Sequence, residues 1–249
     1  MKKLLVPAVA ALMLLSASAA QAVEITYGFA VASDGSGKTS AIAGSPNVFV
    51  ETFDRADGTG GLTLSPSLVK VTTVSGGGFG FAQGNLPTVY AAPLGDSTHF
   101  AYGPDANSTS ASSEVNFDYA GLVSTLPNNA TLNYFGLYYG SIDTYNDVSF
   151  YDAAGNLIQT ITGAQLISQF GGVSGNTDSN NTNIYVNLVF SAAEEFTSFS
   201  FRTTARAFEV DNLVVGYQVT SVEVPEPASL ALIGLGLAGL GFARRRNKN

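Results

Sequence analysis

The sequence contains no cysteine, no tryptophan and only one histidine among its 249 residues. Without cysteine the chain can form no disulfide, no cysteine-ligated zinc site and no thiol nucleophile. The single histidine, His99, leaves too few ligands for a zinc hydrolase. No Gly-x-Ser-x-Gly elbow accompanies it, so the sequence does not indicate a serine triad either. These absences disfavour several common hydrolytic mechanisms.

Charged residues are also scarce, at 12 % of the chain, and they are unevenly distributed. All 19 acidic residues lie between Glu24 and Glu226, where only 5 basic residues occur, so this part of the chain has a net charge of −14. The five cations form no run in the sequence: Lys38, Arg55, Lys70, Arg202 and Arg206. A surface this acidic repels phosphate backbones, and we therefore expect no nucleic-acid partner.

Residues 1–22 have the pattern of a secretory signal peptide, which is expected to be helical before it is removed. Its parts are the basic pair Lys2 and Lys3, the apolar run 4–15 and the small-x-small site Ala20-Gln21-Ala22. We expect signal peptidase to cut after Ala22, so that Val23 becomes the first residue. The alternative, an uncleaved membrane anchor, is disfavoured because the apolar run is short.

Residues 224–249 form a second pattern of three parts. The parts are the box Val224-Pro225-Glu226-Pro227, an uncharged run over 228–243 and the basic cluster Arg244-Arg245-Arg246. A helix over 228–243 rises about 24 Å, slightly less than a bilayer core, but flanking arginines can snorkel to the interface. The run therefore predicts a single transmembrane helix. Because basic residues stay on the cytoplasmic side, the preceding domain is expected to lie outside.

This C-terminal pattern resembles the PEP-CTERM sorting signal, in which a Pro-Glu-Pro box, an apolar helix and a basic end are recognised by an exosortase. Pro225, Glu226 and Pro227 match the box. The resemblance implies transient residence in the inner membrane, processing near the box, and delivery to the cell surface or extracellular matrix. It covers only the C-terminal segment. The alternative is an ordinary membrane anchor preceded by a Pro-Glu-Pro linker.

The middle of the chain, residues 23–223, has short apolar runs separated by Gly, Ser, Thr and Asn, which predicts one all-β domain. Strands are expected over 25–32, 47–53, 68–74, 114–119, 130–139, 147–151, 157–162, 183–190, 198–203 and 207–219. The clearest hairpin has its turn at 152–156, which contains Asp, Gly and Asn.

Only one helix is expected in this domain, over 164–170 and ended by Gly171-Gly172. Loops are expected over 33–45, 76–80 and 173–181. The alternation of Phe199 and Phe201 with polar neighbours suits a strand that buries one face. We therefore predict a jelly-roll-like antiparallel β-sandwich. A β-solenoid is disfavoured because no period recurs along the middle of the chain.

Carboxylates could support glycan hydrolysis without histidine, because such enzymes use one acid to protonate the leaving group and a second to attack or to activate water. Glu194-Glu195 is the obvious adjacent pair, but neighbours on a strand point to opposite faces. Carboxylates that are distant in the sequence but close in the fold cannot be recognised from the sequence alone. Two carboxylates facing each other across a cleft would favour an enzyme, whereas acids at loop edges would favour a binding protein.

Two acidic segments, 49–54 and 208–213, are candidates for a structural calcium site. Residues 208–213 resemble the closing strand of carbohydrate-binding jelly rolls, in which a carboxylate completes such a site. If the terminal strands pair, the candidate ligands would meet: Glu51, Asp54, Glu209 and Asp211. The alternative is that these acids lie on edge strands, where they keep the domain soluble and oppose aggregation.

A second candidate is residues 138–147, an aromatic strand that runs into a polar loop. Aromatic faces can cover the C–H surface of a pyranose while Asp and Asn bind its hydroxyls. The candidate sugar-binding residues are Tyr139, Asp143, Tyr145 and Asn146. The segment resembles a Gly-Ser-x-Asp-x-Tyr-Asn stretch in other exosortase-substrate ectodomains. The alternative is purely structural, since Asp and Asn form turns and tyrosine favours half-buried strands.

Together these features predict a non-catalytic exported protein of the cell surface or extracellular matrix, with polysaccharide and calcium as its candidate ligands. Signal peptidase and an exosortase are its expected processing partners. The alternative is a secreted, carboxylate-dependent, glycan-active enzyme.

Overall fold

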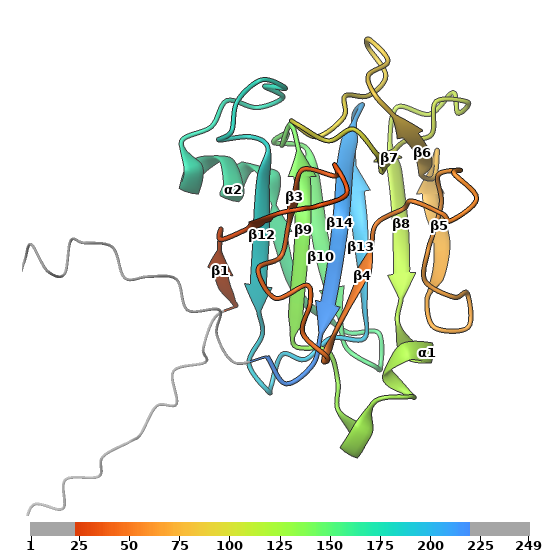
Figure 1. Cartoon of the computed structure of the whole chain (residues 1–249), viewed down its shortest axis with the longest axis vertical. Helices are drawn as coiled ribbons and strands as arrows, with labels where there is room; N and C mark the ends of the chain where they lie inside the picture. Colours follow the sequence, from red (N-terminus) through yellow and green to blue (C-terminus); the bar gives the residue numbers. More distant parts are fainter. Residues whose placement is uncertain (1–22, 220–249) are drawn as a thin grey trace, which may run out of the picture.

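The computed structural model describes residues 23–219, which fold into two facing β-sheets (Figure 1). The predicted signal peptide, its cleavage site at Ala20 and Ala22, and the predicted sorting signal with its transmembrane helix over 228–243 all lie outside the described residues. Within residues 23–219, no helix has the length and apolar character needed to cross a membrane.

The larger sheet has seven strands, and all of its pairings are antiparallel. In spatial order they are β1 (Glu24–Thr26), β12 (Ile184–Val189), β9 (Tyr134–Gly140), β14 (Phe208–Gly216), β7 (His99–Gly103) and β6 (Gly80–Gln83), with β4 (Val48–Glu51) also paired to β14. Strand β14 thus has β9 along one edge and, on the other, first β7 and then β4.

The smaller sheet has five antiparallel strands. Their order is β11 (Leu157–Thr162), β10 (Asn146–Tyr151), β13 (Ser198–Thr203), β8 (Ser113–Asp118) and β5 (Lys70–Gly76). A separate two-stranded ribbon consists of β2 (Ala30–Val31) and β3 (Lys38–Thr39). The predicted all-β antiparallel sandwich is therefore confirmed, while a jelly-roll connectivity within this class stays a prediction.

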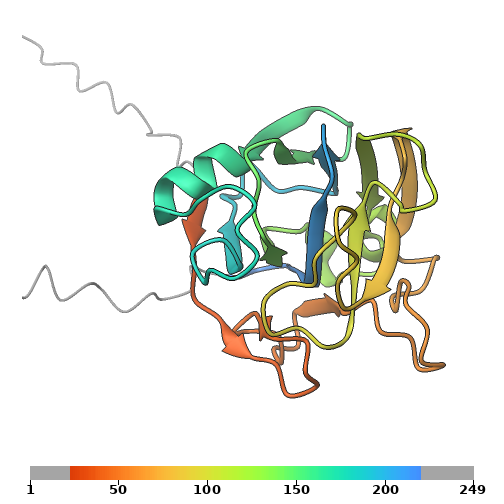
Figure 2. The same cartoon turned by 90° about the horizontal axis from the view of Figure 1, so that it is seen from above.

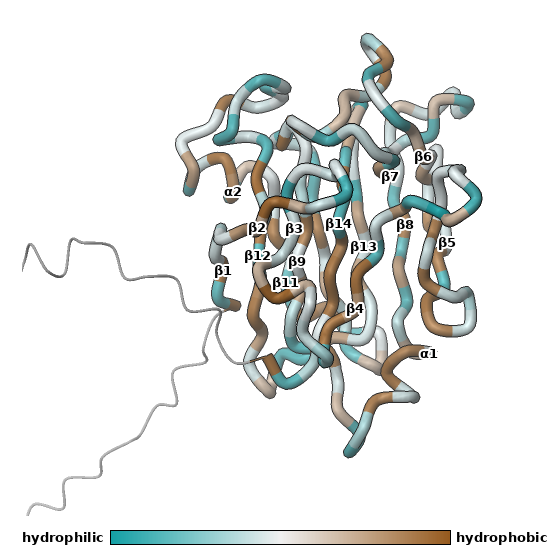
Figure 3. The backbone as a smooth tube through the Cα atoms, viewed as in Figure 1, coloured by the Kyte–Doolittle hydropathy of each residue, from teal (hydrophilic) through white to brown (hydrophobic). Residues whose placement is uncertain are grey.

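Phenylalanine side chains fill the space between the sheets. Phe199 of β13 stacks on Phe117 of β8 at a centroid distance of 5.4 Å, and it meets Phe135 of β9 edge to face at 4.9 Å. In β8 buried and half-buried residues alternate, as expected for a strand with one face in the core. Hydrophobic stretches lie along the strands, including β4 and β14 (Figure 3).

The central strands β9 and β14 are buried at every position, because the outer face of the larger sheet is also covered. The covering segment contains β2 and β3, and its Ile42 packs on the cluster formed by Tyr134, Tyr138 and Tyr185, as does Val48 of β4. The Tyr134 hydroxyl donates to Asn187 Oδ1 at 2.5 Å, and the Tyr138 hydroxyl donates to the Leu94 carbonyl. The larger sheet therefore has a third layer of chain outside it.

Most of the predicted elements are present. The turn at 152–156 joins β10 and β11, and Asp152 accepts the backbone N–H of Ala154 and Asn156. Helix α2 (Gly163–Phe170) begins where Thr162 Oγ1 accepts the Gln165 N–H, and it ends at Gly171, whose φ of +65° is easiest for glycine.

Other expectations about the elements need correction. Strands β6 and β7 and the short helices α1 (Ala120–Val123) and η1 (Pro127–Asn129) were not expected, so α2 is not the only helix. The strand expected over 25–32 is divided into β1 and β2, and the loop expected over 33–45 contains β3. The reason is length: β2 and β3 have two residues each, too few for an alternating pattern to be visible.

Candidate functional site

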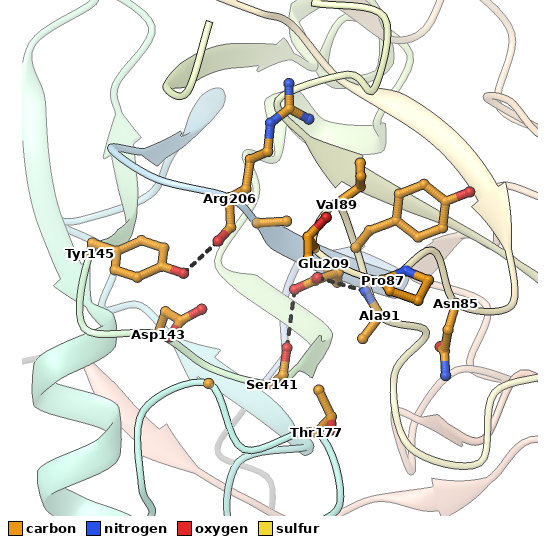
Figure 4. Close-up of a pocket in the computed structure, with 14 residues that line it drawn as sticks. Asn85, Pro87, Val89, Ala91, Ser141, Asp143, Tyr145, Thr177, Arg206 and Glu209 are labelled. Atoms are coloured by element: carbon orange, nitrogen blue, oxygen red, sulfur yellow. Dashed lines mark hydrogen bonds between the residues drawn. The ribbon is translucent and has the colours of Figure 1, made fainter.

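A pocket of about 440 Å³ lies at the end of the sandwich where β9 ends and β14 begins. Figure 2 views the backbone of the sandwich from above. Its walls come from four parts of the chain: the loop 85–91, the β9–β10 connection at 141–145, residues 175 and 177 after α2, and residues 206–209 at the start of β14. The Tyr145 ring lines it from the β9–β10 connection (Figure 4). Tyr90 lines it from the loop 85–91, and the Tyr90 ring packs on Tyr102 at a centroid distance of 4.3 Å. The pocket therefore combines aromatic rings with polar groups.

Glu209 of β14 lies at the edge of this pocket with only 3 % of its surface exposed. Its Oε1 accepts the Ala91 N–H at 3.0 Å, and its Oε2 accepts the Ser141 hydroxyl at 3.2 Å (Figure 4). Burial raises the pKa of Glu209 to about 8, because the charged form loses its hydration and gains no cation. Near neutral pH this carboxyl is largely protonated and can donate a hydrogen bond.

Asp143 lines the same pocket from the β9–β10 connection. Its Oδ1 accepts the Ser174 hydroxyl at 2.9 Å, and burial raises its pKa above the usual value. Gly175 packs so closely that a Cβ there would lie 2.8 Å from Asp143 Oδ1, and its φ of +68° also favours glycine. The loop after α2 thus needs glycine at this position to fit against Asp143.

Tyr145 is half-buried beside Asp143, and its hydroxyl donates to the Arg206 carbonyl at 2.7 Å. The Arg206 guanidinium points away from Asp143 and Glu209 (Figure 4). It donates instead to backbone carbonyls of the loop after β7, with its shortest bond, 2.7 Å, to Ser108. Although Arg206 lines the pocket, its charge is used to hold that loop.

The four residues predicted to bind sugar fall into two pairs with different surroundings. Asp143 and Tyr145 line the pocket. Tyr139 is completely buried and stacks on Phe208 at a centroid distance of 4.7 Å, within the core between the sheets. Asn146 is also completely buried, where its Nδ2 donates to the Ala207 carbonyl at 3.0 Å. Tyr139 and Asn146 therefore support the pocket from inside and present no surface to a ligand.

The two acidic segments do pair, with Glu51 of β4 opposite Leu213 of β14. Their four acids nevertheless lie in different surroundings. Glu51 is buried and accepts four donors, the N–H groups of Phe53, Thr63 and Leu64 and the Thr63 hydroxyl. The structure thus gives Glu51 a structural role, fixing the chain that follows β4, and its oxygens are already occupied.

The other three acids are spread along β14 and the chain facing it. Glu209 lies in the pocket, Asp211 is buried two residues further along, and Asp54 Oδ1 accepts the His99 N–H at 2.8 Å and lies 3.1 Å from His99 Nδ1. Within residues 23–219, no group of three or more His, Asp or Glu side chains is arranged to hold a metal ion. Calcium binding stays a prediction.

Sequence reasoning missed several residues that shape these sites. Ser141 and the loop 85–91 complete the surroundings of Glu209, and Asp96 lies close to Asp211. The uninterrupted apolar run over 134–139 was a usable signal for Tyr139, because a strand buried on both faces loses its alternation. No comparable pattern in the sequence indicated that the loop 85–91 would line the pocket.

The comparisons with known proteins concern mainly the C-terminus. Residues 223–246 match the model of the PEP-CTERM protein-sorting motif, which confirms the predicted sorting signal and supports export to the cell surface through an exosortase. No curated protein matches the sequence. Among solved structures, the chain is similar to the enzymatically active domain of tailspike protein 4 from bacteriophage CBA120, with 14 % identity and a TM-score of 0.33. That alignment covers 61 % of this chain and 20 % of the tailspike chain.

The raised pKa of Glu209 predicts a pH-dependent stability. The folded chain holds this proton up to a pH of about 8, whereas the ordinary value is 4.5, so the resulting stabilisation is complete below pH 4.5 and is lost as the pH rises through 8. We expect the melting temperature to fall between about pH 5 and pH 8.5, and to fall less in Glu209→Gln, which is neutral throughout.

Differential scanning calorimetry across this pH range measures the effect. Glu24→Gln removes a carboxylate that is exposed on β1, and it is expected to reproduce the wild-type profile. Parallel curves for the wild type and Glu209→Gln would show that Glu209 does not hold its proton more tightly in the folded chain.

Proposed function

We propose that the chain is a non-catalytic exported protein of the cell surface or extracellular matrix, whose pocket at the loop end of the sandwich binds polysaccharide. The observation that carries this proposal is the lining of that pocket. It combines the ring of Tyr145, and the residue Tyr90 whose ring packs on Tyr102, with the polar groups of Ser141, Asp143 and Glu209. Aromatic faces and a few oriented hydrogen-bonding groups are what a sugar ring requires.

The charges around the pocket favour a neutral sugar. Asp143 accepts hydrogen bonds, and protonated Glu209 donates one, so together they match the two-way character of a sugar hydroxyl. The guanidinium of Arg206 is bonded elsewhere and offers no cation to a carboxylate or phosphate on the ligand. An acidic polysaccharide would therefore meet like charge without compensation.

The sorting motif supports a location for this binding. Its match at residues 223–246 indicates a protein that is exported and handled by an exosortase, so its pocket would meet extracellular rather than cytoplasmic glycans. Processing by signal peptidase, a transient stay in the inner membrane and subsequent release belong to the same proposal.

A second candidate function is a carboxylate-dependent, glycan-active enzyme. It is favoured by one specific observation: two carboxyls in different environments, Glu209 and Asp143, line the same pocket. A protonated acid beside a second carboxyl is the arrangement that glycoside hydrolysis uses. Release of reducing ends from a bound oligosaccharide by the wild type but not by Glu209→Gln would establish the enzyme, and an intact oligosaccharide would leave the binding protein.

The sugar-binding proposal predicts that Tyr145 is required for binding. On an array of neutral oligosaccharides, Tyr145→Ala is expected to lose at least about tenfold in affinity, because the ring provides one wall of the pocket. Tyr145→Phe keeps the ring and loses the bond to the Arg206 carbonyl, so it should retain most of the binding.

Tyr217→Ala, which changes a half-buried tyrosine just after β14 that does not line the pocket, serves as the matched control. Circular dichroism should show that all variants are folded. A blank array for the wild type, or equal binding by the wild type and Tyr145→Ala, would overturn the proposal.

The sorting motif predicts that surface delivery depends on an exosortase. Deletion of the exosortase gene should leave the protein in the membrane fraction with its C-terminal segment intact by mass spectrometry. Replacing Pro225 and Pro227 by alanine in an otherwise normal cell should have the same effect. Unchanged surface delivery in the deletion strain would contradict exosortase sorting, whatever the pocket binds.

A further inference from the structure

Asp211 lies where strand β14 changes its hydrogen-bonded partner along one edge, from β7 to β4. On one edge of β14, residues 208–210 pair with β7 and residues 213–216 pair with β4, so Asp211 falls between the two partners. On the other edge the register with β9 shifts between Asp211 and Val214, and Asn212 has a φ of +44°. Such a bulge redirects the side chains around it. The Asn212 amide fastens the bulge to the outer layer by donating to Ser36 and Lys38.

The carboxyl of Asp211 is completely buried. Among residues 23–219 neither of its oxygens has a hydrogen bond of good geometry, although the Asn212 N–H lies close to it. Asp96, in the chain that leads into β7, lies within hydrogen-bonding reach of it. Asp96 Oδ1 accepts the N–H and hydroxyl of Thr98, both at 2.8 Å, but its Oδ2 is buried without a partner. Three carboxylate oxygens, two on β14 and one on the loop that leads into β7, therefore have no hydrogen-bond donor of good geometry among the described residues.

Among the described residues, no positive side chain forms an ion pair with either of these two carboxyls. Within residues 23–219, the ion pairs are His99 with Asp54 and Arg202 with Asp147, and neither includes Asp96 or Asp211. The negative charge of Asp54 also reaches both carboxyls and raises their pKa values further. Unpaired buried carboxylates are costly, so the fold needs something that neutralises them.

Two carboxylate oxygens are both acceptors, so they attract each other only when a proton or a cation lies between them. One shared proton would neutralise one of the two charges and leave Asp54 to repel the other. A divalent cation would neutralise both. Calcium prefers carboxylate and carbonyl oxygens in a flexible shell of six to eight ligands, which the side chains, backbone carbonyls and water can supply together. Asp96 also lines a second pocket of about 230 Å³, so this side of the pair borders a space that is open to solvent.

We propose that Asp96 and Asp211 bind a divalent cation, calcium by the chemistry of the oxygens, and that the ion ties the chain before β7 to the bulge in β14. This site is separate from the proposed sugar pocket, which Asp211 and Asp96 do not line. It also differs from the set expected from the sequence: Asp211 remains, Asp96 is new, and Glu51 and Glu209 have other partners.

The test uses the full-length protein, purified in detergent and stripped of metal with a chelator. Its melting temperature is then measured with added calcium, with added magnesium and with chelator alone. Calcium at about one hundred times its Kd should raise the melting temperature by about 5 to 10 °C. Magnesium should raise it less, because its octahedral shell is less adaptable. Isothermal titration calorimetry gives the stoichiometry, which is expected to be one ion per chain.

The variants Asp211→Asn and Asp96→Asn should lose the calcium response while their melting temperatures in chelator equal or exceed that of the wild type, because each removes one repelling charge. Glu24→Gln, which removes an exposed carboxylate elsewhere, should respond to calcium as the wild type does. If a variant fails to fold, terbium luminescence is measured on the wild type. Terbium that binds and is displaced by calcium would support the site, and terbium that does not bind would contradict it.

Two results would overturn the proposal. The first is a wild type whose melting temperature is the same in calcium and in chelator. A fall with rising pH that persists in Glu209→Gln but is reduced in Asp211→Asn would then assign a shared proton to the carboxyl pair. The second is calcium binding that persists unchanged in Asp211→Asn. Neither result depends on whether the neighbouring pocket binds sugar.

Discussion

The burial of carboxyl groups on the central strand β14 is the constraint on which the rest of this structure depends. Phe208 and Val210 face the core between the sheets, so Glu209 and Asp211 project to the opposite face of the same strand. That face would normally be wet in an antiparallel sheet. Here it is covered by chain from the first hundred residues, and both acids are almost fully removed from water.

The buried carboxyls of Glu209 and Asp211 are stabilised in different ways, although the two residues lie only about 7 Å apart along the strand. Glu209 is neutralised by its own proton and supported by the Ala91 N–H and the Ser141 hydroxyl. Asp211 has no such donors and faces a second carboxyl, Asp96. One position therefore provides a proton donor at the edge of a pocket, and the other provides a place for a cation. The proposed sugar site and the proposed cation site thus both depend on a buried carboxyl of strand β14.

Much of the fold could be predicted from the sequence, because its signals are local. The alternation around Phe199, the Asp and Gly of the 152–156 turn, and Gly171 at the end of α2 each depend on neighbours within a few residues. The pairing of β4 with β14, which the calcium hypothesis took as its condition, is present. The short strands β6 and β7 were missed because they lie in a stretch whose glycines and prolines favour loops.

The candidate site was harder to predict because it depends on contacts across the sheet. Asp143 and Tyr145 were identified from their place after an aromatic strand, and they do line the pocket. Glu209 was assigned to calcium because its neighbours in the sequence suggested a closing strand, whereas its actual partners, Ala91 and Ser141, are far from it in the chain. Asp96 was not singled out for the same reason: its significance comes from Asp211, which lies 115 residues later.

The most direct test of the central claim is the ionisation of Glu209 itself. The side-chain carboxyl carbons can be followed by 13C NMR during a pH titration, with the Glu209 signal assigned by its absence in Glu209→Gln. We expect a midpoint near 8, because the carboxyl is buried without a cation beside it. A midpoint near 4.5, the ordinary value for glutamate, would mean that the carboxyl is hydrated and charged, and would contradict the covered β14 face on which both proposed sites rest.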